Sequence, residues 1–154
     1  RLPDGREQDY HVFEVTNAVA VVPLTAAGEV LMLWQYRYTH GRCHWEIPAG
    51  RIHAQEDPAD AARRELLEET GHRAAEMQPL PGFFPTNGIS AHYAHLYLAR
   101  GCTRVAELDL DASEQLSVRA WPLAEARRRL LAGEFADGFT ALALFYALAA
   151  IDAG

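Results

Sequence analysis

The chain has 154 residues, of which 49% are hydrophobic, and we expect residues 1–154 to form one domain with a substantial core. The formal net charge is −7 and no run of basic residues occurs, which argues against binding to a nucleic-acid backbone. We recognise neither a secretory signal peptide nor an apolar stretch long enough to cross a membrane.

Three strands are predicted before the first long helix. Residues 11–15 alternate apolar and polar side chains, as a half-buried strand does. Residues 18–24 are rich in valine, which favours a more buried strand. After a turn at residues 25–28, residues 29–35 are expected to form the hairpin partner of that strand.

The segment between this hairpin and the helix contains two residues of functional interest. Arg37, at the end of the strand, is either a solvated strand end or a substrate contact whose paired donors bind a phosphate. Residues 45–50, with the sequence WEIPAG, lead towards the helix. Gly50 ends this segment, and its missing side chain allows the backbone to approach another group closely.

A long helix is predicted over residues 59–70, which contain neither glycine nor proline. Asp57 is a suitable N-cap and Pro58 suits the first helical position, where no backbone donor is needed. Gly71 is expected to end the helix. One stripe of the helix is apolar and should face the core: Ala59, Ala62 and Leu66.

The neighbouring stripe of this helix is acidic. Glu65, Glu68 and Glu69 are three and four positions apart and therefore share one face, where their charges repel each other. A hard divalent cation removes this conflict, because Mg²⁺ and Mn²⁺ prefer oxygen ligands. Arg64 stands one turn before Glu68 and can pair with it. A solvated acidic face is the alternative, but the fixed positions of the flanking residues favour the metal site.

Two further regions after the helix carry candidate residues. Residues 73–80 are expected to return to the sheet, and residues 81–90 form a loop rich in turn-forming residues. In that loop, Phe83 or Phe84 either stacks on a nucleobase or covers the core. The alternation over residues 91–98 predicts another strand.

The C-terminal third begins with an acidic segment. Residues 106–114 form either a solvated turn or a loop that delivers a late carboxylate, Glu114, to the metal site. A last strand is predicted over residues 116–121 and a helix over residues 123–131. Residues 139–151 form a strongly apolar helix that packs on the sheet or in a dimer interface.

Residues 50–72 fit the pattern G-x5-E-x7-R-E-U-x-E-E-x-G-U, where U is a bulky apolar residue, except that His72 occupies the last position. This pattern resembles the Nudix box. The strings VVPL, QYR, EIPAG and DGFTALAL elsewhere in the chain resemble the ADP-ribose and nucleotide-sugar pyrophosphatase branch of that family. The resemblance covers nearly the whole chain and implies an α+β fold, the Nudix α/β/α sandwich with a mixed β-sheet and a loop–helix–loop.

The resemblance also implies a function. It indicates a pyrophosphohydrolase that requires Mg²⁺ or Mn²⁺ and cleaves a nucleoside diphosphate linked to another moiety, X, as in ADP-ribose or a nucleotide sugar. Water attacks one phosphorus of the diphosphate bridge, and the metal neutralises charge and activates the water. Two alternatives stay open: hydrolysis of nucleoside triphosphates or dinucleoside polyphosphates, and a non-catalytic nucleotide-binding Nudix sensor. Where the branch typically has a proline and then an acid, this chain has Asn87 and His92.

Roles for individual residues follow from the same resemblance. The expected metal ligands are the Ala49 carbonyl, Glu65, Glu68 and Glu69. The expected catalytic residues are Arg64, Glu68, Glu69 and Glu114, with Glu56 bracing the loop and the helix. The expected substrate contacts are Arg37, Gly50 and Phe84. The general base is either Glu114, for which Asp109 or Asp111 could substitute, or a glutamate of the box.

The expected partners are a small nucleoside diphosphate derivative and a second copy of the chain in a homodimer, without nucleic acid or membrane. The two cysteines, Cys43 and Cys102, have no zinc-binding spacing, and we expect both to be small buried hydrophobic residues. Free cysteines are typical of a reducing compartment, so we expect a cytoplasmic protein.

Overall fold

A computed structural model describes residues 1–110 and 115–153 of the chain. Helices and strands follow one another in this order: β1 (Ala18–Thr25), β2 (Glu29–Arg37), β3 (Arg42–Glu46), β4 (Ala49–Arg51), α1 (Pro58–Thr70), β5 (His72–Arg73), β6 (Glu76–Phe83), β7 (Ala94–Arg104), β8 (Leu116–Pro122), α2 (Leu123–Leu131) and α3 (Gly138–Asp152). Glu114 and Asp111, two of the predicted loop acids, lie outside the described residues.

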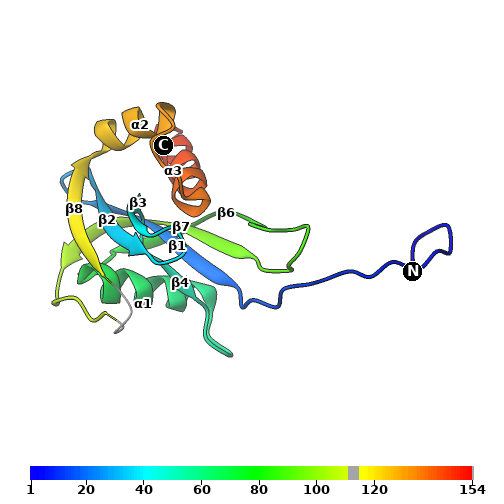
Figure 1. The fold of residues 1–154 in the computed structure, drawn as a ribbon. Coiled ribbons are helices and arrows are strands. Elements are labelled where there is room, and N and C mark those ends of the chain that lie inside the picture. Colours follow the sequence, from blue (N-terminus) through cyan, green and yellow to red (C-terminus); the bar gives the residue numbers. More distant parts are fainter. Residues whose placement is uncertain (111–114, 154) are drawn as a thin grey trace.

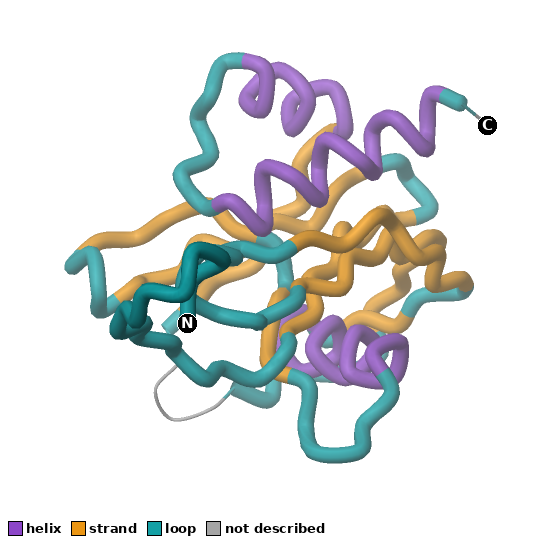
Figure 2. The backbone as a smooth tube through the Cα atoms, turned by 90° about the vertical axis from the view of Figure 1, so that its right-hand side faces the viewer, coloured by secondary structure: helices purple, strands orange, loops and turns teal. Residues whose placement is uncertain are grey.

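Strand β1 is the centre of a mixed sheet. It pairs antiparallel with β2 and β4 and parallel with β7, while β3 and β8 pair with β2, and β5 and β6 pair with β7. Helix α1 covers one face of the sheet, and α2 and α3 cover the other (Figures 1 and 2). The predicted α+β class and its α/β/α sandwich are therefore confirmed.

The alternation of side chains along β1 divides the core between the two faces. Val19 and Val21 pack with the buried face of α1, whereas Ala20 and Val22 pack with α3. Both faces of β1 are covered, and this is why residues 18–24 are continuously apolar. That run of apolar residues made the buried strand predictable from the sequence. Among the described residues, no helix is long and apolar enough to span a membrane.

The structure corrects four predictions about local structure. Strand β6 ends at Phe83, so the first three residues of the loop predicted over residues 81–90 belong to a strand. Residues 11–15 are not a strand: within residues 1–110 and 115–153, the Phe13 amide alone of this segment donates a backbone hydrogen bond, to the Ile89 carbonyl. Strand β7 begins at Ala94 rather than at residue 91. Of the two free cysteines, Cys102 is buried as expected, but Cys43 is only partly buried.

Candidate functional site

The signals at both ends of α1 act as predicted. The Asp57 side chain accepts a hydrogen bond from the Ala59 amide at 2.8 Å, and Pro58 occupies the first turn. At the other end Gly71 adopts the left-handed conformation, with φ of 70°, and its amide bonds to the Leu67 carbonyl. These caps fix the length of the helix and hence the position of its acidic stripe.

The acidic stripe of α1 faces the backbone of β4 and not solvent alone. Glu65 and Glu69 are buried, with 7% and 2% of their surface exposed, and Glu68 is partly exposed. The Ala49 amide donates a hydrogen bond to Oε2 of Glu69 at 3.0 Å. The alternative of a solvated acidic face is therefore wrong for Glu65 and Glu69.

Gly50 allows the Glu65 carboxylate to lie against the strand. A Cβ atom at position 50 would lie 1.9 Å from Oε1 of Glu65 and 2.1 Å from its Cδ, which is far inside any permitted contact. The backbone of Gly50 does not have a positive φ, so the glycine is required for space and not for conformation. Gly50 and Glu65, fifteen residues apart in the sequence pattern, are thus in direct contact.

Arg64 connects the helix to the loop before it. Its guanidinium forms two hydrogen bonds with the Glu56 carboxylate, at 2.9 and 3.0 Å, and one with the Arg51 carbonyl at 3.0 Å. Its Nη1 also binds Glu65 at 2.7 Å and Glu68 at 3.0 Å. The hydrogen bonds from Arg64 lower the pKa of Glu56 to about 2, and its carboxylate partners raise the pKa of Arg64. The predicted pairing of Arg64 with Glu68 is confirmed.

The charges of this acidic cluster do not balance internally. Three carboxylates, those of Glu56, Glu65 and Glu68, bind the guanidinium of Arg64, and the fourth, that of Glu69, accepts a hydrogen bond from the Ala49 amide. Among the described residues, no three acidic, histidine or cysteine side chains are arranged so that they could hold a metal ion. Burying carboxylates costs free energy unless a cation compensates them, and all the donors are oxygen atoms. The cluster therefore matches a hard divalent cation in the chemistry of its donors, but not in a preformed geometry.

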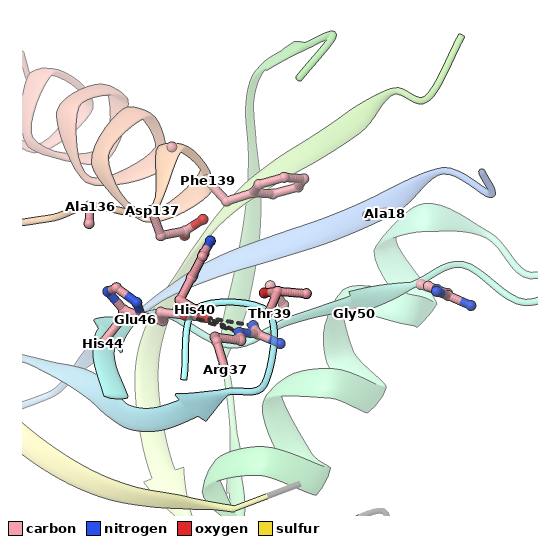
Figure 3. A pocket seen from close by; sticks show the side chains of 13 residues that line it. Ala18, Arg37, Thr39, His40, His44, Glu46, Gly50, Ala136, Asp137 and Phe139 are labelled. Carbon is pink, nitrogen blue, oxygen red and sulfur yellow. Dashed lines mark hydrogen bonds and ion pairs between the residues drawn. The ribbon is translucent and has the colours of Figure 1, made fainter. Parts of the chain in front are cut away.

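A cavity of about 430 Å³ opens beside the Ala49–Gly50 backbone. It is lined by β2–β4, the turn between β2 and β3, and the segment that enters α3 (Figure 3). Arg37 lies at its wall and bonds to the buried Glu46, with Nε 3.0 Å from Oε1 and 3.1 Å from Oε2. This pairing raises the pKa of Arg37. Arg37 is therefore not merely a solvated strand end.

The other candidate residues after α1 are less tightly grouped. Phe84 is 53% exposed and does not line the cavity. Its ring makes a T-shaped contact with the ring of Tyr93, with the two centroids 4.9 Å apart. Phe83 instead packs against Phe139 beside the core. The acidic segment begins next to the helix, because the Asp109 amide donates to the Glu68 carbonyl at 2.9 Å.

Most residues of the cavity were not predicted from the sequence, among them Glu46, His44 and Asp137. Asp137 carried a local signal, since an Asp three residues before Thr140 and ahead of an apolar run is a helix N-cap pattern. Glu46 stood in the EIPAG string, but the β2–β3 register places it opposite Leu33, and only the side chains of the folded structure bring it to Arg37. His44 gave no signal of its own.

Comparisons with known proteins identify the family and agree with the observed fold. The model of the NUDIX domain matches residues 15–142. The chain is 37% identical over 156 residues to an ADP-ribose pyrophosphatase of Mycobacterium tuberculosis, covering all of this chain and 75% of that protein. It is 32% identical over 146 residues to an ADP-ribose pyrophosphatase of Bacillus subtilis, covering 94% of this chain and 79% of that protein. A solved structure of an ADP compounds hydrolase superposes with a TM-score of 0.79 at 23% identity, over 89% of this chain and 73% of that one.

Proposed function

Because the chain belongs to the NUDIX domain family, we propose that it is a pyrophosphohydrolase that cleaves the diphosphate bridge of ADP-ribose or of a closely related nucleoside diphosphate derivative. The observation that carries this proposal is the position of the acidic cluster. Glu65 and Glu69 lie against the backbone at Ala49 and Gly50, and the cavity lined by Arg37 opens at the same backbone. The two relatives named as ADP-ribose pyrophosphatases support the choice of substrate.

We propose that Glu65, Glu68, Glu69 and the Ala49 carbonyl hold the cation, Mg²⁺ or Mn²⁺. Such an ion, when bound, neutralises charge on the phosphoryl oxygens and lowers the pKa of an attacking water. Glu65 and Glu69 are the buried members and are already positioned by their contacts with the strand. Glu68 is more exposed and is held by Arg64.

The chain's own side chains supply positioning. Arg64 and Glu56 brace the loop and the helix, and this keeps the carboxylates of α1 facing the strand. Arg37 is proposed to bind a phosphate oxygen from the wall of the cavity, because Glu46 engages its Nε and Nη2 and orients the guanidinium. Phe84 offers an exposed ring, and we propose that it stacks on the base.

A general base is proposed from the acidic loop or from the box. Glu114 is the first candidate, since the loop that leads to it begins beside the C-terminal end of α1. Glu114→Gln should then lower kcat much more than it raises KM, with Asp109→Asn and Asp111→Asn as parallel variants. Full activity in all three variants would assign the base to a box glutamate, Glu68 or Glu69.

A panel of nucleotides incubated with Mg²⁺ or with EDTA, with products separated by chromatography, tests the function. We expect ADP-ribose to give AMP and ribose 5-phosphate only when the cation is present. Release of pyrophosphate from nucleoside triphosphates, without cleavage of diphosphate derivatives, would favour the triphosphate alternative. Binding without any cleavage would favour a sensor.

We also propose a homodimer in a reducing, cytoplasmic setting. The segment of residues 9–17 extends away from the sheet (Figure 1), and its apolar side chains are exposed: Tyr10, Val12, Phe13 and Val15. Covering them with a second copy would explain why residues 11–15 have a half-buried strand pattern. Light scattering should give twice the chain mass, and Phe13→Asp should reduce it to one chain. A wild-type mass of one chain at micromolar concentration would contradict the dimer.

A further inference from the structure

We propose that a second cavity, between helix α1 and the strand β5 that follows it, binds the phosphoryl group of an organic phosphate monoester. The cavity has a volume of about 420 Å³. Its described lining is half basic and half apolar and consists of Arg63, Arg64, Arg73, Leu66, Leu67 and Ala74. None of these residues lines the cavity beside Ala49 and Gly50, so the inference does not rest on the proposed function.

The turn at Gly71 brings the two walls of this cavity together. On α1, Arg63 and Leu67 are four residues apart and therefore share one face of the helix. The helix ends at Gly71, and β5 starts at the next residue. Arg73 is thus ten residues from Arg63 in the sequence, and both line the same cavity.

Two of the three guanidinium groups are available to a ligand. The Arg73 side chain is exposed and forms no hydrogen bond or ion pair with any described residue. Arg63 forms one ion pair, with Asp60 at 3.0 Å, in which 57% and 71% of the two side chains are exposed. Such an exposed pair contributes little to stability, so a stronger anionic partner can replace Asp60.

The third guanidinium forms part of the wall but offers no free charge, because Arg64 already binds three carboxylates of the acidic cluster. No carboxylate occurs in the described lining, so a ligand meets the positive charges of Arg63 and Arg73. A phosphate monoester carries a charge of about −1.5 to −2 at neutral pH, which is more than a carboxylate carries. Two guanidinium groups therefore match a phosphoryl group, whose oxygens accept their paired donors.

The apolar half of the lining indicates what the phosphoryl group is attached to. Leu66 is a buried member of the core cluster on the α1 face of the sheet, Ala74 packs against that cluster, and Leu67 is partly buried. An apolar group that covers these side chains removes their surface from water, which inorganic phosphate cannot do. The formal net charge of −7 repels anions at long range, so the attraction of an anion to this cavity must be local.

Calorimetry in metal-free buffer with phenyl phosphate as the probe tests the site. We expect saturable binding, with inorganic phosphate and benzoate each weaker because one lacks the apolar ring and the other the second negative charge. Arg63→Gln and Arg73→Gln should each raise the Kd of phenyl phosphate about tenfold, as loss of one charge-assisted hydrogen bond does. Arg127→Gln removes the same charge from an arginine of α2 that does not line the cavity, and it should leave this Kd unchanged.

Amide chemical shifts in nitrogen-15-labelled protein show where the probe binds. Phenyl phosphate should shift the amides of Leu67 and Ala74 more than those of Ala49 and Gly50. Arg37→Gln should leave the Kd unchanged, because Arg37 lines the other cavity. These measurements need no catalysis, so they stay decisive if the protein cleaves no nucleotide.

Four results would overturn the inference. They are an absence of saturable binding to the wild-type protein, benzoate binding as tight as that of phenyl phosphate, shifts confined to Ala49 and Gly50, and an unchanged Kd in both Arg63→Gln and Arg73→Gln. Because both arginines are exposed, the variants should fold, and thermal unfolding checks this.

Discussion

Replacing Gly50 with alanine should disable the site while leaving the fold intact. The added Cβ would lie 1.9 Å from Oε1 of Glu65, and ordinary contact begins at 3.4 Å, so the carboxylate must retreat by about 1.5 Å. Misplacement of a reacting group by about 1 Å can cost on the order of 100-fold in rate. We therefore expect kcat for ADP-ribose to fall about 100-fold with little change in KM.

The same displacement affects stability in a calculable direction. Moving Glu65 breaks its 2.7 Å hydrogen bond with Arg64, and a charge-assisted bond contributes about 1.5–3 kcal/mol. Exchange of glycine for alanine restricts the unfolded chain, which raises the free energy of unfolding by about 0.4–1 kcal/mol. The free energy of unfolding, measured in urea, should therefore fall by a net amount on the order of 1–2 kcal/mol.

Two controls separate this steric mechanism from general damage. Gly88→Ala adds a Cβ with nothing within 4 Å, so it should leave kcat unchanged and should not lower the free energy of unfolding. Because Gly50→Ala acts through one carboxylate, combining it with Glu65→Gln should lower kcat little further than Glu65→Gln alone. A folded Gly50→Ala protein with wild-type kcat, or losses that simply multiply in the double variant, would refute the reasoning.

Three further predictions follow from the acidic cluster. Glu69→Gln keeps the shape of a buried side chain and removes its charge, so kcat should fall at least about 100-fold while the fold is unchanged. The control Glu76→Gln, on the surface, should leave kcat unchanged. Wild-type kcat in Glu69→Gln would exclude Glu69 as a metal ligand. EDTA should abolish hydrolysis, and Mg²⁺ or Mn²⁺ should restore it better than Zn²⁺, because the proposed ligands are all oxygen; full turnover in excess chelator would contradict this. Arg64 lowers the pKa of Glu56 to about 2 from 4.5, so this carboxylate stabilises the fold above pH 4.5 and that contribution is lost as the pH falls towards 2. Urea unfolding should show Glu56→Gln less stable than wild type at pH 7, with the gap closing below pH 4.5; a gap independent of pH would be evidence against the pairing.

Helix α1 could be predicted almost to the residue because its signals are local. Asp57, Pro58 and Gly71 act within one turn of the positions that they cap, and the apolar stripe is periodic over a few turns. Strands β3 and β4 could not be predicted in the same way. They are five and three residues long, and they exist because β2 and β1 offer them backbone partners.

The residues of the candidate site likewise differ in whether local sequence signals could predict them. The acids of α1 and Arg64 were predictable because they lie on one helix. That Glu65 and Glu69 are buried was not, because it depends on their contact with Ala49 and Gly50, which are distant in the chain. The link between Ile47 and Thr140 spans 93 residues, and no local pattern predicts such a pairing.

The failed prediction for residues 11–15 has a related cause. Alternation of apolar and polar side chains indicates a surface that is half covered, but it does not say what covers it. In the single chain Phe13 and Val12 remain exposed. The pattern therefore stays consistent with coverage by a second copy.

The most direct test of the central claim is a time course of ADP-ribose hydrolysis by the wild-type protein with Mg²⁺, in which all products are quantified. We expect AMP and ribose 5-phosphate to accumulate in equal amounts, with no pyrophosphate, and a higher kcat/KM for ADP-ribose than for ATP. Release of pyrophosphate from ATP at a higher kcat/KM than for ADP-ribose cleavage, or no cleavage of either nucleotide, would contradict the account.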